Sequence, residues 1–313
     1  MRKDERIFVA GHRGLVGSAI VRRLQSGGFG NLVLRGHDQL DLRDAAAVDR
    51  FYREERPDCT IVAAAKVGGI LANQTFPAEF IRDNLAIQTH LIHSAWEHGT
   101  RKLLFLGSSC IYPRDCPQPI REEYLLSGPL EPTNEAYAIA KIAGLKMCQA
   151  YRRQYGFDAI VAMPTNLYGP GDNFHPEQSH VLPALMRRIH EAHARGDAEV
   201  VIWGSGTPRR EFLHVDDLAS AVLFLLERYS GHDCVNVGTG EDLSILELAG
   251  MIADVVGFKG GIALDRSKPD GTPRKLLAVD RLRNLGWSAS ISLRSGIADT
   301  YRWFLAHQDQ VRA

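Results

Sequence analysis

The chain has 313 residues, of which 45% are hydrophobic and 24% are charged, a composition typical of a globular protein with one large core or a core and a smaller lobe. Lys plus Arg and Asp plus Glu both number 37, so no basic excess is available for a nucleic-acid backbone or an acidic membrane surface. No apolar run reaches the roughly 18–20 residues of a bilayer-spanning helix, and the apolar segment after the basic N-terminus is too short for a signal peptide.

The five cysteines are an odd number, and no two of them form a C-x-x-C pair. Cys110 and Cys116 also lack nearby Cys or His pairs of the kind that bind zinc. The other three are Cys59, Cys148 and Cys234. We therefore expect free thiols in a reducing cytoplasm, and neither a disulfide framework nor a metal site.

Apolar segments and helix-like segments alternate along the first half of the chain. The expected strands are residues 7–11, 31–34, 59–65, 102–109 and 158–164, and the expected helices are 15–26, 44–54, 77–96 and 135–155. Continuous apolar strands that alternate with helices predict an α/β fold, with a Rossmann-type doubly wound parallel sheet covered on both faces. In such a sheet, ligands bind beyond the carboxyl ends of the strands.

After about residue 170 the pattern becomes less regular. We expect a helix at 181–195, a strand at 200–203 and a helix at 218–228 capped by Asp216 and Asp217. Ser244 and Glu247 have the spacing of a capping box. The expected organisation is a larger Rossmann-type domain of residues 1–172, with segments from 211–240 and 280–313, and a smaller, discontinuous α/β lobe of residues 173–210 and 241–279.

The first expected strand ends in GHRGLVG, in which Gly11, Gly14 and Gly17 are spaced by three residues. Gly11 allows a tight turn, Gly14 allows the backbone to approach a pyrophosphate, and Gly17 allows the next helix to pack close to the sheet. The helix N-terminus then presents free N–H groups and a partial positive charge to the phosphates. An ordinary glycine turn is the alternative, but a strand before and a helix after it favour a dinucleotide site.

The end of the second expected strand indicates which dinucleotide binds. NAD sites usually have an acidic residue there, on the ribose 2′-hydroxyl, whereas this chain has Arg35 and His37. Arg13, inside the glycine turn, is a further cation. We therefore predict NADP(H), with both arginines near the 2′-phosphate; the alternative for Arg35 is a solvated position at the strand end. Asp41 and Leu42 are candidates to flank the adenine.

Tyr137 and Lys141 are four residues apart and share one face of an expected helix. A tyrosine that donates a proton to a carbonyl near neutral pH needs a lowered pKa, and a positive charge about 4 Å away supplies up to about 4 kcal/mol at an effective dielectric near 20. A surface tyrosine beside a solvated lysine is the alternative for Y-x-x-x-K alone. Here the pair follows a dinucleotide turn and a strand that ends in Ser108 and Ser109, which favours a catalytic role.

The motifs occur in the order GHRGLVG, AAAKVGGI, FLGSSCIYP, EAYAIAK and PTNLYGPGDNFHP, and continue with WGSGTPRREFLHVDD, VNVGTG and SKPDGTPRKLL. This order resembles the extended short-chain dehydrogenase/reductases and, within them, the GDP-L-fucose synthase family. The resemblance covers nearly the whole chain. The glycine turn and Y-x-x-x-K identify only the superfamily, whereas SSCIYP together with DNFHPEQSH is much more specific.

The resemblance implies an NADPH-dependent conversion of GDP-4-keto-6-deoxy-D-mannose to GDP-L-fucose, by epimerisation at C3 and C5 and reduction of the C4 ketone. It implies that Ser108, Tyr137 and Lys141 form the reductase triad and that Cys110 and His180 carry the epimerisation. Because the ketone acidifies the protons at C3 and C5, one base and one acid on opposite faces of the sugar suffice. A thiol whose pKa is lowered by nearby positive charge suits the base, and an imidazole suits the acid.

For the cofactor, the resemblance implies contacts at the strand ends and around the triad: Gly11, His12, Arg13, Gly14, Leu15, Val16, Gly17, Arg35, His37, Asp41, Leu42, Leu106, Gly107, Tyr137, Lys141, Pro164, Thr165, Asn166, Leu167 and His180. One departure is His37, where the family often has an arginine that helps to hold the 2′-phosphate. For the substrate, the resemblance implies Arg188, Trp203, Arg210 and Asp270 in the smaller, substrate-binding lobe. Arginine suits a diphosphate because it binds two oxygens at once, whereas a tryptophan is more often a core residue.

Two other functions stay open at this point. The nearest is another nucleotide-sugar enzyme, a 4-epimerase or a dehydratase, although a dehydratase is expected to carry an acid pair where this chain has Ser-Ser-Cys. The other is a non-catalytic NADP-binding sensor, which would not need Tyr137, Lys141 and Cys110 together. The long helices at 77–96 and 135–155 carry apolar stripes, so we expect a homodimer, with no nucleic-acid or membrane partner.

Overall fold

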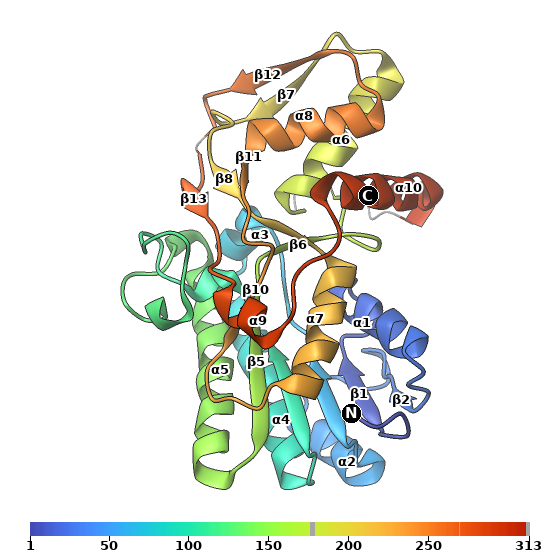
Figure 1. The fold of residues 1–313 in the computed structure, drawn as a ribbon, viewed down its shortest axis with the longest axis vertical. Coiled ribbons are helices and arrows are strands. Elements are labelled where there is room, and N and C mark those ends of the chain that lie inside the picture. The colour runs from blue at the N-terminus through green and yellow to red at the C-terminus, as the bar shows by residue number, and fades with distance from the viewer. Residues whose placement is uncertain (176–178, 269, 311–313) are drawn as a thin grey trace.

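The computed structural model describes residues 1–175, 179–268 and 270–310 (Figure 1). Residues 176–178 of DNFHPEQSH, residue 269 of SKPDGTPRKLL and residues 311–313 therefore lie outside the described part. The largest sheet has six parallel strands in the order β10-β5-β4-β3-β1-β2. These strands are β1 (Ile7–Ala10), β2 (Leu32–Val33), β3 (Cys59–Val62), β4 (Lys102–Leu106), β5 (Asp158–Pro164) and β10 (Val235–Val237).

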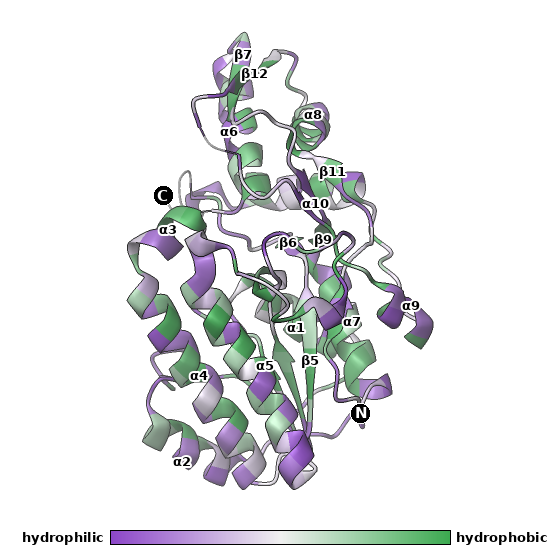
Figure 2. Cartoon of the chain, turned by 90° about the vertical axis from the view of Figure 1, so that its left-hand side faces the viewer, coloured by the Kyte–Doolittle hydropathy of each residue, from purple (hydrophilic) through white to green (hydrophobic). Residues whose placement is uncertain are grey.

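Helices cover both faces of this sheet, which confirms the predicted doubly wound fold (Figures 1 and 2). On one face, Ile20 of α1 and Val222 of α7 are buried against β1 and β5. On the other face, α2, α4 and α5 bury Phe51, Leu91 and Leu145. The helices are α1 (Leu15–Ser26), α2 (Ala45–Glu55), α3 (Ile70–Thr75), α4 (Pro77–Glu97), α5 (Glu135–Tyr155), α7 (Val215–Arg228) and α9 (Asp280–Leu285), with 3₁₀ turns η1 (Ser109–Ile111), η2 (Glu122–Tyr124) and η3 (Pro132–Asn134).

A smaller group of helices and strands lies beyond the carboxyl ends of the sheet strands (Figure 1). It comprises α6 (Val181–Arg195), β7 (Glu199–Trp203), α8 (Ile245–Val256), β12 (Gly261–Asp265), α10 (Leu293–Ala306) and the turn η4 (Gln308–Gln310). Its separate core includes Ile189, Ile202 and Ile252. Ile297 and Phe304 of α10 pack into that core, whereas the sequence placed residues 280–313 in the larger domain. We propose a domain division in which α9 stays with the larger domain and α10 joins the smaller lobe.

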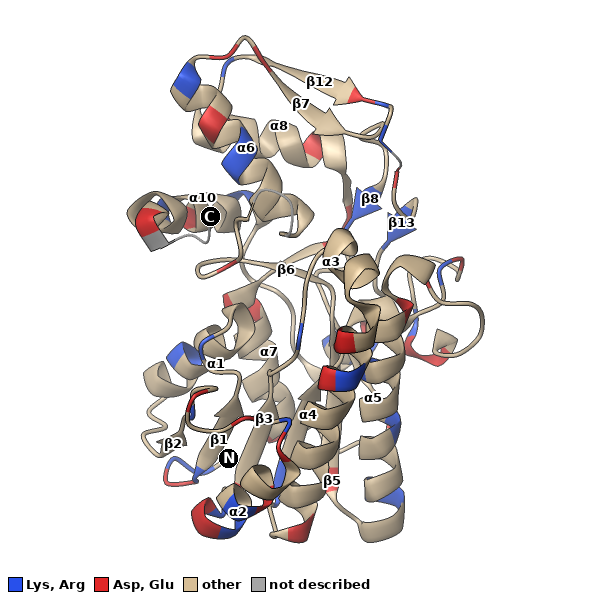
Figure 3. Cartoon of the chain, turned by 180° about the vertical axis from the view of Figure 1, so that it is seen from behind, with Lys and Arg blue, Asp and Glu red and all other residues tan. Residues whose placement is uncertain are grey.

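Short strands join the two parts of the molecule. β8 (Arg209–Arg210) pairs with β11 (Leu243–Ser244) and with β13 (Arg274–Lys275), and β6 (Asn166–Tyr168) pairs with β9 (Phe212–His214). Figure 3 shows β8 and β13 as neighbouring basic strands between the two parts. Glu211 is fully buried between β8 and β9, and its carboxylate accepts from the backbone N–H groups of Thr239, Gly240 and Leu277 at 2.7, 2.8 and 3.0 Å. This carboxylate therefore fixes three segments that are far apart in the sequence.

Of the two predicted helix caps, the one at the start of α8 is present and the one at the start of α7 is not. Ser244 and Glu247 form the predicted capping box at the start of α8, with Glu247 N–H 3.1 Å from Ser244 Oγ. The predicted caps of α7 are wrong: His214 accepts from the Asp216 N–H, and Asp217 accepts from Ser290 and Ile291 N–H groups. Tertiary contacts thus override the local preference of aspartate for the N-cap. In the described part of the chain, no helix is both long and apolar enough to cross a membrane.

Candidate active site

The GSSCIYP segment turns sharply at the carboxyl end of β4. Ser108 caps the turn η1, since its hydroxyl accepts from the Cys110 N–H at 3.4 Å. Ser109 is 4% exposed and lies inside the turn. The Ser108 hydroxyl therefore contacts the backbone of its own loop. The cap also keeps Ser108 and Cys110 together at the strand end.

Tyr137 and Lys141 lie in the first two turns of α5, beside the end of β4. Lys141 is 4% exposed, and its Nζ donates to the carbonyl of Leu106 at 2.9 Å. The same Nζ lies 5.8 Å from the centre of the Tyr137 ring and 4.8 Å from that of Phe105. Burial lowers the pKa of Lys141 to about 8. The solvated-lysine alternative is therefore wrong.

The expected lowering of the Tyr137 pKa does not occur in the protein alone. Burial raises the pKa of Tyr137 strongly, the charge of Cys110 raises it further, and a hydrogen bond to Ser108 opposes both effects. The physical reason is that desolvation of a phenolate outweighs the neighbouring groups. Tyr137 is consequently fully protonated near neutral pH and is a hydrogen-bond donor. The link to Ser108 and Cys110 places all three side chains in one group.

Lys275 of β13 is a further cation at this group, which the sequence analysis did not single out. Burial raises the pKa of Cys110, and the first opposing influence is the charge of Lys275, followed by Ser108 and Lys141. Burial also lowers the pKa of Lys275 itself, against the attraction of Cys110. The pKa of the thiol is therefore above its ordinary value, contrary to expectation, because two cations do not offset its burial.

His180 is the N-terminal boundary residue of α6. Its residue surface is exposed, yet the protein around the imidazole is dense enough to lower its pKa by desolvation. The charge of Lys275 lowers the same pKa further. Lys275 therefore faces both predicted epimerisation residues, Cys110 and His180, which come from different parts of the fold.

The glycine turn after β1 has the geometry expected of a dinucleotide site. Gly11 has φ +86°, and a Cβ there would lie 2.7 Å from Ala64 N; a Cβ on Gly17 would lie 2.1 Å from Gly11 O. These two glycines are required by the protein's own packing. A Cβ on Gly14 would meet only Gly11 O at 3.5 Å, so the protein alone leaves room there for a ligand. Beside it, His12 Nδ1 is buried without a hydrogen-bond partner among the described residues.

Arg13 and Arg35, the two arginines predicted to lie near the 2′-phosphate, differ in their contacts within the protein. Arg35 donates to Glu55 of α2 and, at 3.0 Å, to the carbonyl of Leu34, so its guanidinium is already occupied. Arg13 is exposed, and its Nη1 would lie 2.8 Å from a Cβ on residue 36 and lies 3.5 Å from Asp38. Arg13 is therefore the arginine available for a 2′-phosphate.

The remaining predicted cofactor residues lie along the same edge of the sheet. The Asp41 carboxylate accepts hydrogen bonds from Arg43, which hold the pKa of Asp41 below its usual range, and exposed His37 lies 4.0 Å from Asp41. The Leu42 carbonyl contacts His90 Nδ1 at 3.0 Å. The other residues lie at the carboxyl ends of β4 and β5, just beyond those ends, or at the start of α1: Leu15, Val16, Leu106, Gly107, Pro164, Thr165, Asn166 and Leu167.

The predicted substrate residues form a second group in the smaller lobe. Trp203 is 56% exposed at the end of β7, so the core alternative is wrong. The Arg188 guanidinium lies 5.1 Å and Lys268 Nζ 5.6 Å from the centre of its ring. Asp270 accepts from Ser205 N–H at 2.9 Å, two residues beyond Trp203. These contacts bring segments near residues 188, 203 and 270 together.

Arg210 lies between the two groups. Its Nη1 donates to the Thr272 carbonyl at 2.6 Å, and its charge acts on Lys275, which is beside Cys110. A Cβ on Gly271 would lie 3.0 Å from Arg210 Nη2, next to Asp270. The cations therefore continue from the triad to the tryptophan, as a diphosphate-linked sugar requires.

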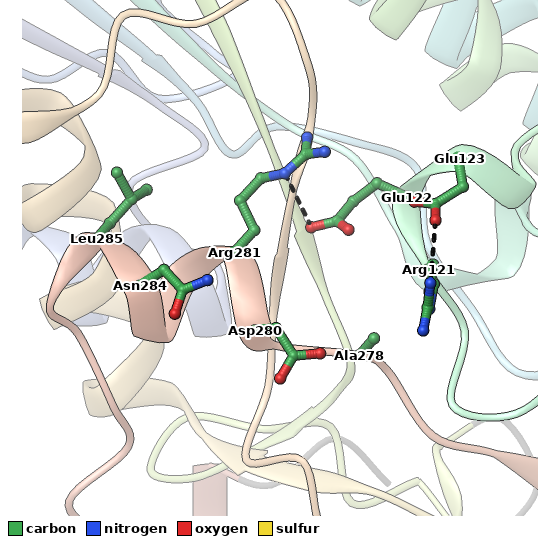
Figure 4. Close-up of a pocket in the computed structure, with 8 residues that line it drawn as sticks. All are labelled: Arg121, Glu122, Glu123, Ala278, Asp280, Arg281, Asn284 and Leu285. Carbon is green, nitrogen blue, oxygen red and sulfur yellow. Dashed lines mark ion pairs between the residues drawn. The ribbon is translucent and has the colours of Figure 1, made fainter.

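A different pocket, of about 540 Å³, lies against α9 and η2 (Figure 4). Four of its charged side chains form two ion pairs: Arg281 is 3.8 Å from Glu122, and Arg121 is 3.7 Å from Glu123. None of its lining residues belongs to either group of predicted site residues. We assign it no part in the active site.

The sequence matches the NAD dependent epimerase/dehydratase family over residues 7–238. A protein of Arabidopsis thaliana named putative GDP-L-fucose synthase 2 is 64% identical over 305 residues, 97% of this chain and 93% of that protein. GDP-L-fucose synthase of Escherichia coli K12 is 57% identical over 98% of this chain and 99% of its own. The solved GDP-L-fucose synthetase of Naegleria fowleri bound to NADP has a TM-score of 0.92 at 30% identity and covers 100% of this chain and 98% of that one. The chain belongs to the NAD dependent epimerase/dehydratase family and, within it, to the GDP-L-fucose synthases.

Proposed function

We propose that the protein converts GDP-4-keto-6-deoxy-D-mannose to GDP-L-fucose by epimerisation at C3 and C5 followed by NADPH-dependent reduction at C4. The observation that carries this proposal is the group formed by Ser108, Tyr137 and Lys141 with Cys110, at the carboxyl end of β4. A reductase alone needs the first three residues. The thiol and His180, both facing Lys275, add the acid–base pair that epimerisation requires.

The turn after β1 fits NADPH, because the room at Gly14 and the unpartnered Nδ1 of His12 lie where its phosphates would approach. NADPH supplies the hydride that reduces C4. Arg13 would hold its 2′-phosphate, while Gly14 N–H and the N-terminus of α1 would hold the pyrophosphate. Lys141, fixed by the Leu106 carbonyl, would hold the nicotinamide ribose and favour proton transfer by Tyr137.

Each proton removal at C3 or C5 places negative charge on the C4 oxygen. Tyr137, protonated and joined to Ser108, donates to that oxygen, and Ser108 is the second donor. The same pair serves the reduction, in which Tyr137 transfers its proton to the C4 alkoxide. One binding position for the carbonyl is therefore sufficient for all three chemical steps.

Cys110 removes the proton from one face of the sugar and His180 returns a proton to the other face. Burial favours a neutral Cys110 thiol and a neutral His180 imidazole, and in this state the transferable proton is on the thiol. The reactive pair, thiolate and imidazolium, holds the same number of protons with the proton moved to His180. The rate is therefore expected to be level over a wide pH range between the lowered pKa of His180 and the raised pKa of Cys110.

The GDP end occupies the smaller lobe in this proposal. Arg210 and Arg188 bind the diphosphate, and the exposed face of Trp203 borders the base. Asp270 accepts from hydroxyl groups or from the base. The five free thiols fit a cytoplasmic protein.

A homodimer is part of the same proposal. Trp96 and Tyr155 stack at a ring separation of 4.2 Å on the outer side of α4 and α5, next to Tyr151. Tyr155 is 46% exposed and Ile139, on the same helix, is 42% exposed. An aromatic and apolar surface of this kind favours pairing of these helices with a second copy. Light scattering at micromolar concentration that gives the mass of one chain would remove this part of the proposal.

The direct test is incubation of the purified protein with GDP-4-keto-6-deoxy-D-mannose and NADPH in deuterated water. We expect loss of NADPH absorbance and GDP-L-fucose that carries deuterium at C3 and C5. Reduction without deuterium at either carbon would leave a simple 4-reductase. No NADPH consumption, in a protein that still binds NADP, would favour the sensor.

A further inference from the structure

A pocket of about 410 Å³ lies between α6 and β7, which is within the usual range of small-molecule sites. Its lining includes Arg188 and Trp203, together with Arg195, Asp197, Glu199 and Val201. Two of the four residues assigned above to the GDP end thus line one pocket. The inference below rests on the proposed function, because it concerns how this pocket would select its base.

The free edge of β7 faces this pocket. β7 pairs with β12 on one side, and no other described strand pairs with it. Arg188 Nη1 donates to the Val201 carbonyl at 3.1 Å, so the backbone of Val201 is directed toward α6. Because the N–H and C=O of one strand residue point the same way, the Val201 N–H is available on that side as a donor.

Two acidic side chains line the pocket, and they differ in their contacts. Asp197 accepts from Arg195 Nε at 3.0 Å and from Nη2 at 2.7 Å, so its carboxylate is already paired. Glu199 is exposed and has no hydrogen bond or ion pair with any described side chain. It alternates with Val201 and Trp203 on the exposed face of β7, with about 6.6 Å between successive members of the row. Glu199 is therefore the free acceptor in a row that is otherwise apolar.

Guanine is the base whose edge matches this arrangement. It presents an O6 acceptor beside two adjacent donors, N1–H and the N2 amino group, and a carboxylate accepts two parallel hydrogen bonds. Adenine and cytosine have a ring nitrogen acceptor in the middle of the corresponding edge. The partial negative charge of this nitrogen would be repelled by the carboxylate. Val201 N–H supplies the donor for O6, and the exposed side chains of Val201 and Trp203 supply the apolar wall.

We propose that Glu199 is the residue that selects a guanine nucleotide, by accepting hydrogen bonds from N1–H and N2–H of the base at the free edge of β7. Sites built to hydrogen-bond a donor reject an analogue that lacks it more strongly than apolar pockets reject a missing methylene. Inosine diphosphate is the sharpest probe, because hypoxanthine keeps N1–H and O6 and lacks only the N2 amino group. Uridine diphosphate tests the base as a whole.

The experiment measures dissociation constants of GDP, IDP and UDP by calorimetry for the wild type, Glu199→Ala and Asp197→Asn. We expect the wild type to bind GDP roughly 10- to 100-fold more tightly than IDP. Glu199→Ala is expected to bind GDP about as weakly as the wild type binds IDP, which reduces the GDP/IDP ratio to about 1–3. Asp197→Asn, which changes the neighbouring paired acid, is expected to keep the wild-type ratio. Equal NADP binding and equal melting temperatures establish that the variants are folded.

The outcomes separate this inference from the proposed function. If the wild type prefers GDP and Glu199→Ala keeps the full GDP/IDP ratio, the inference is overturned and the proposed function stands. If Asp197→Asn loses the ratio as completely as Glu199→Ala, the effect is one of net charge and the inference is again overturned. If the wild type binds UDP as tightly as GDP, the proposed guanosine substrate is itself wrong.

Discussion

The six-stranded sheet and the smaller lobe contribute different kinds of residue to the proposed reaction centre. The sheet part places Ser108, Tyr137 and Lys141 at the ends of long, regular elements, where backbone hydrogen bonds and packing fix them. The smaller part contributes His180 and Lys275 from a helix boundary and from a strand of two residues. In the proposed mechanism, the carbonyl-binding half of the chemistry is therefore built into the fold, whereas the acid–base half depends on how the two parts are held together.

The largest effect is expected at the group that both halves use. Tyr137→Phe removes the donor to the C4 oxygen, so reduction is expected to fall about 10³-fold, within the usual range for a general acid. Proton exchange at C3 and C5 should fall as well, because the same oxygen carries the charge of both enolates. Deuterium incorporation from solvent, measured without NADPH, reports the exchange step by itself. Exchange at the wild-type rate in this variant would mean that two separate carbonyl positions exist.

Cys110→Ser is expected to separate the two halves. A serine is a far weaker base than a thiol at the same place, so exchange at C3 and C5 should fall about 10²- to 10³-fold. Ser108, Tyr137 and Lys141 are unchanged in this variant, and reduction of the unepimerised ketone should therefore continue. Analysis of the sugar product distinguishes the two reactions. Formation of GDP-L-fucose at the normal rate would show that Cys110 is not part of the acid–base pair.

The regular part of the molecule was largely readable from the sequence. Helices α1, α5 and α6 and strand β5 have the boundaries that periodicity predicted, because burial of one face determines both the pattern and the element. The contacts that the sequence could not provide are long-range. Arg35 pairs with Glu55 on another helix, and Lys275 reaches Cys110 from 165 positions away, counting from 110 to 275 in the chain. No local pattern records either contact, although Lys275 lay inside a motif that carried the family resemblance.

Lys275→Met tests whether the smaller part tunes the acid–base pair. Lys275 lowers the pKa of both Cys110 and His180, so its loss should raise both values. The acid limb and the alkaline limb of the exchange rate are then expected to move together to higher pH, while the rate on the plateau between them changes little, because both pKa values shift in the same direction. Lys268→Met is the matched control, since it removes a cation beside Trp203. A uniform loss of rate with both limbs unmoved would instead indicate a purely structural role.

Arg13→Ala and Arg35→Ala form a pair within the sheet part, where the smallest effect is expected. An exposed arginine that binds a phosphate contributes about 1.4 kcal/mol, so Arg13→Ala should raise the KM for NADPH roughly 10-fold and leave that for NADH nearly unchanged. Arg35 is held by Glu55 and the Leu34 carbonyl, so Arg35→Ala should change the ratio of the two KM values little, while lowering the melting temperature. The opposite pattern, with the ratio lost in Arg35→Ala, would mean that Arg35 leaves Glu55 when the cofactor binds. The sequence ranked the two arginines together, and the ion pair at Glu55 is the physical reason to separate them.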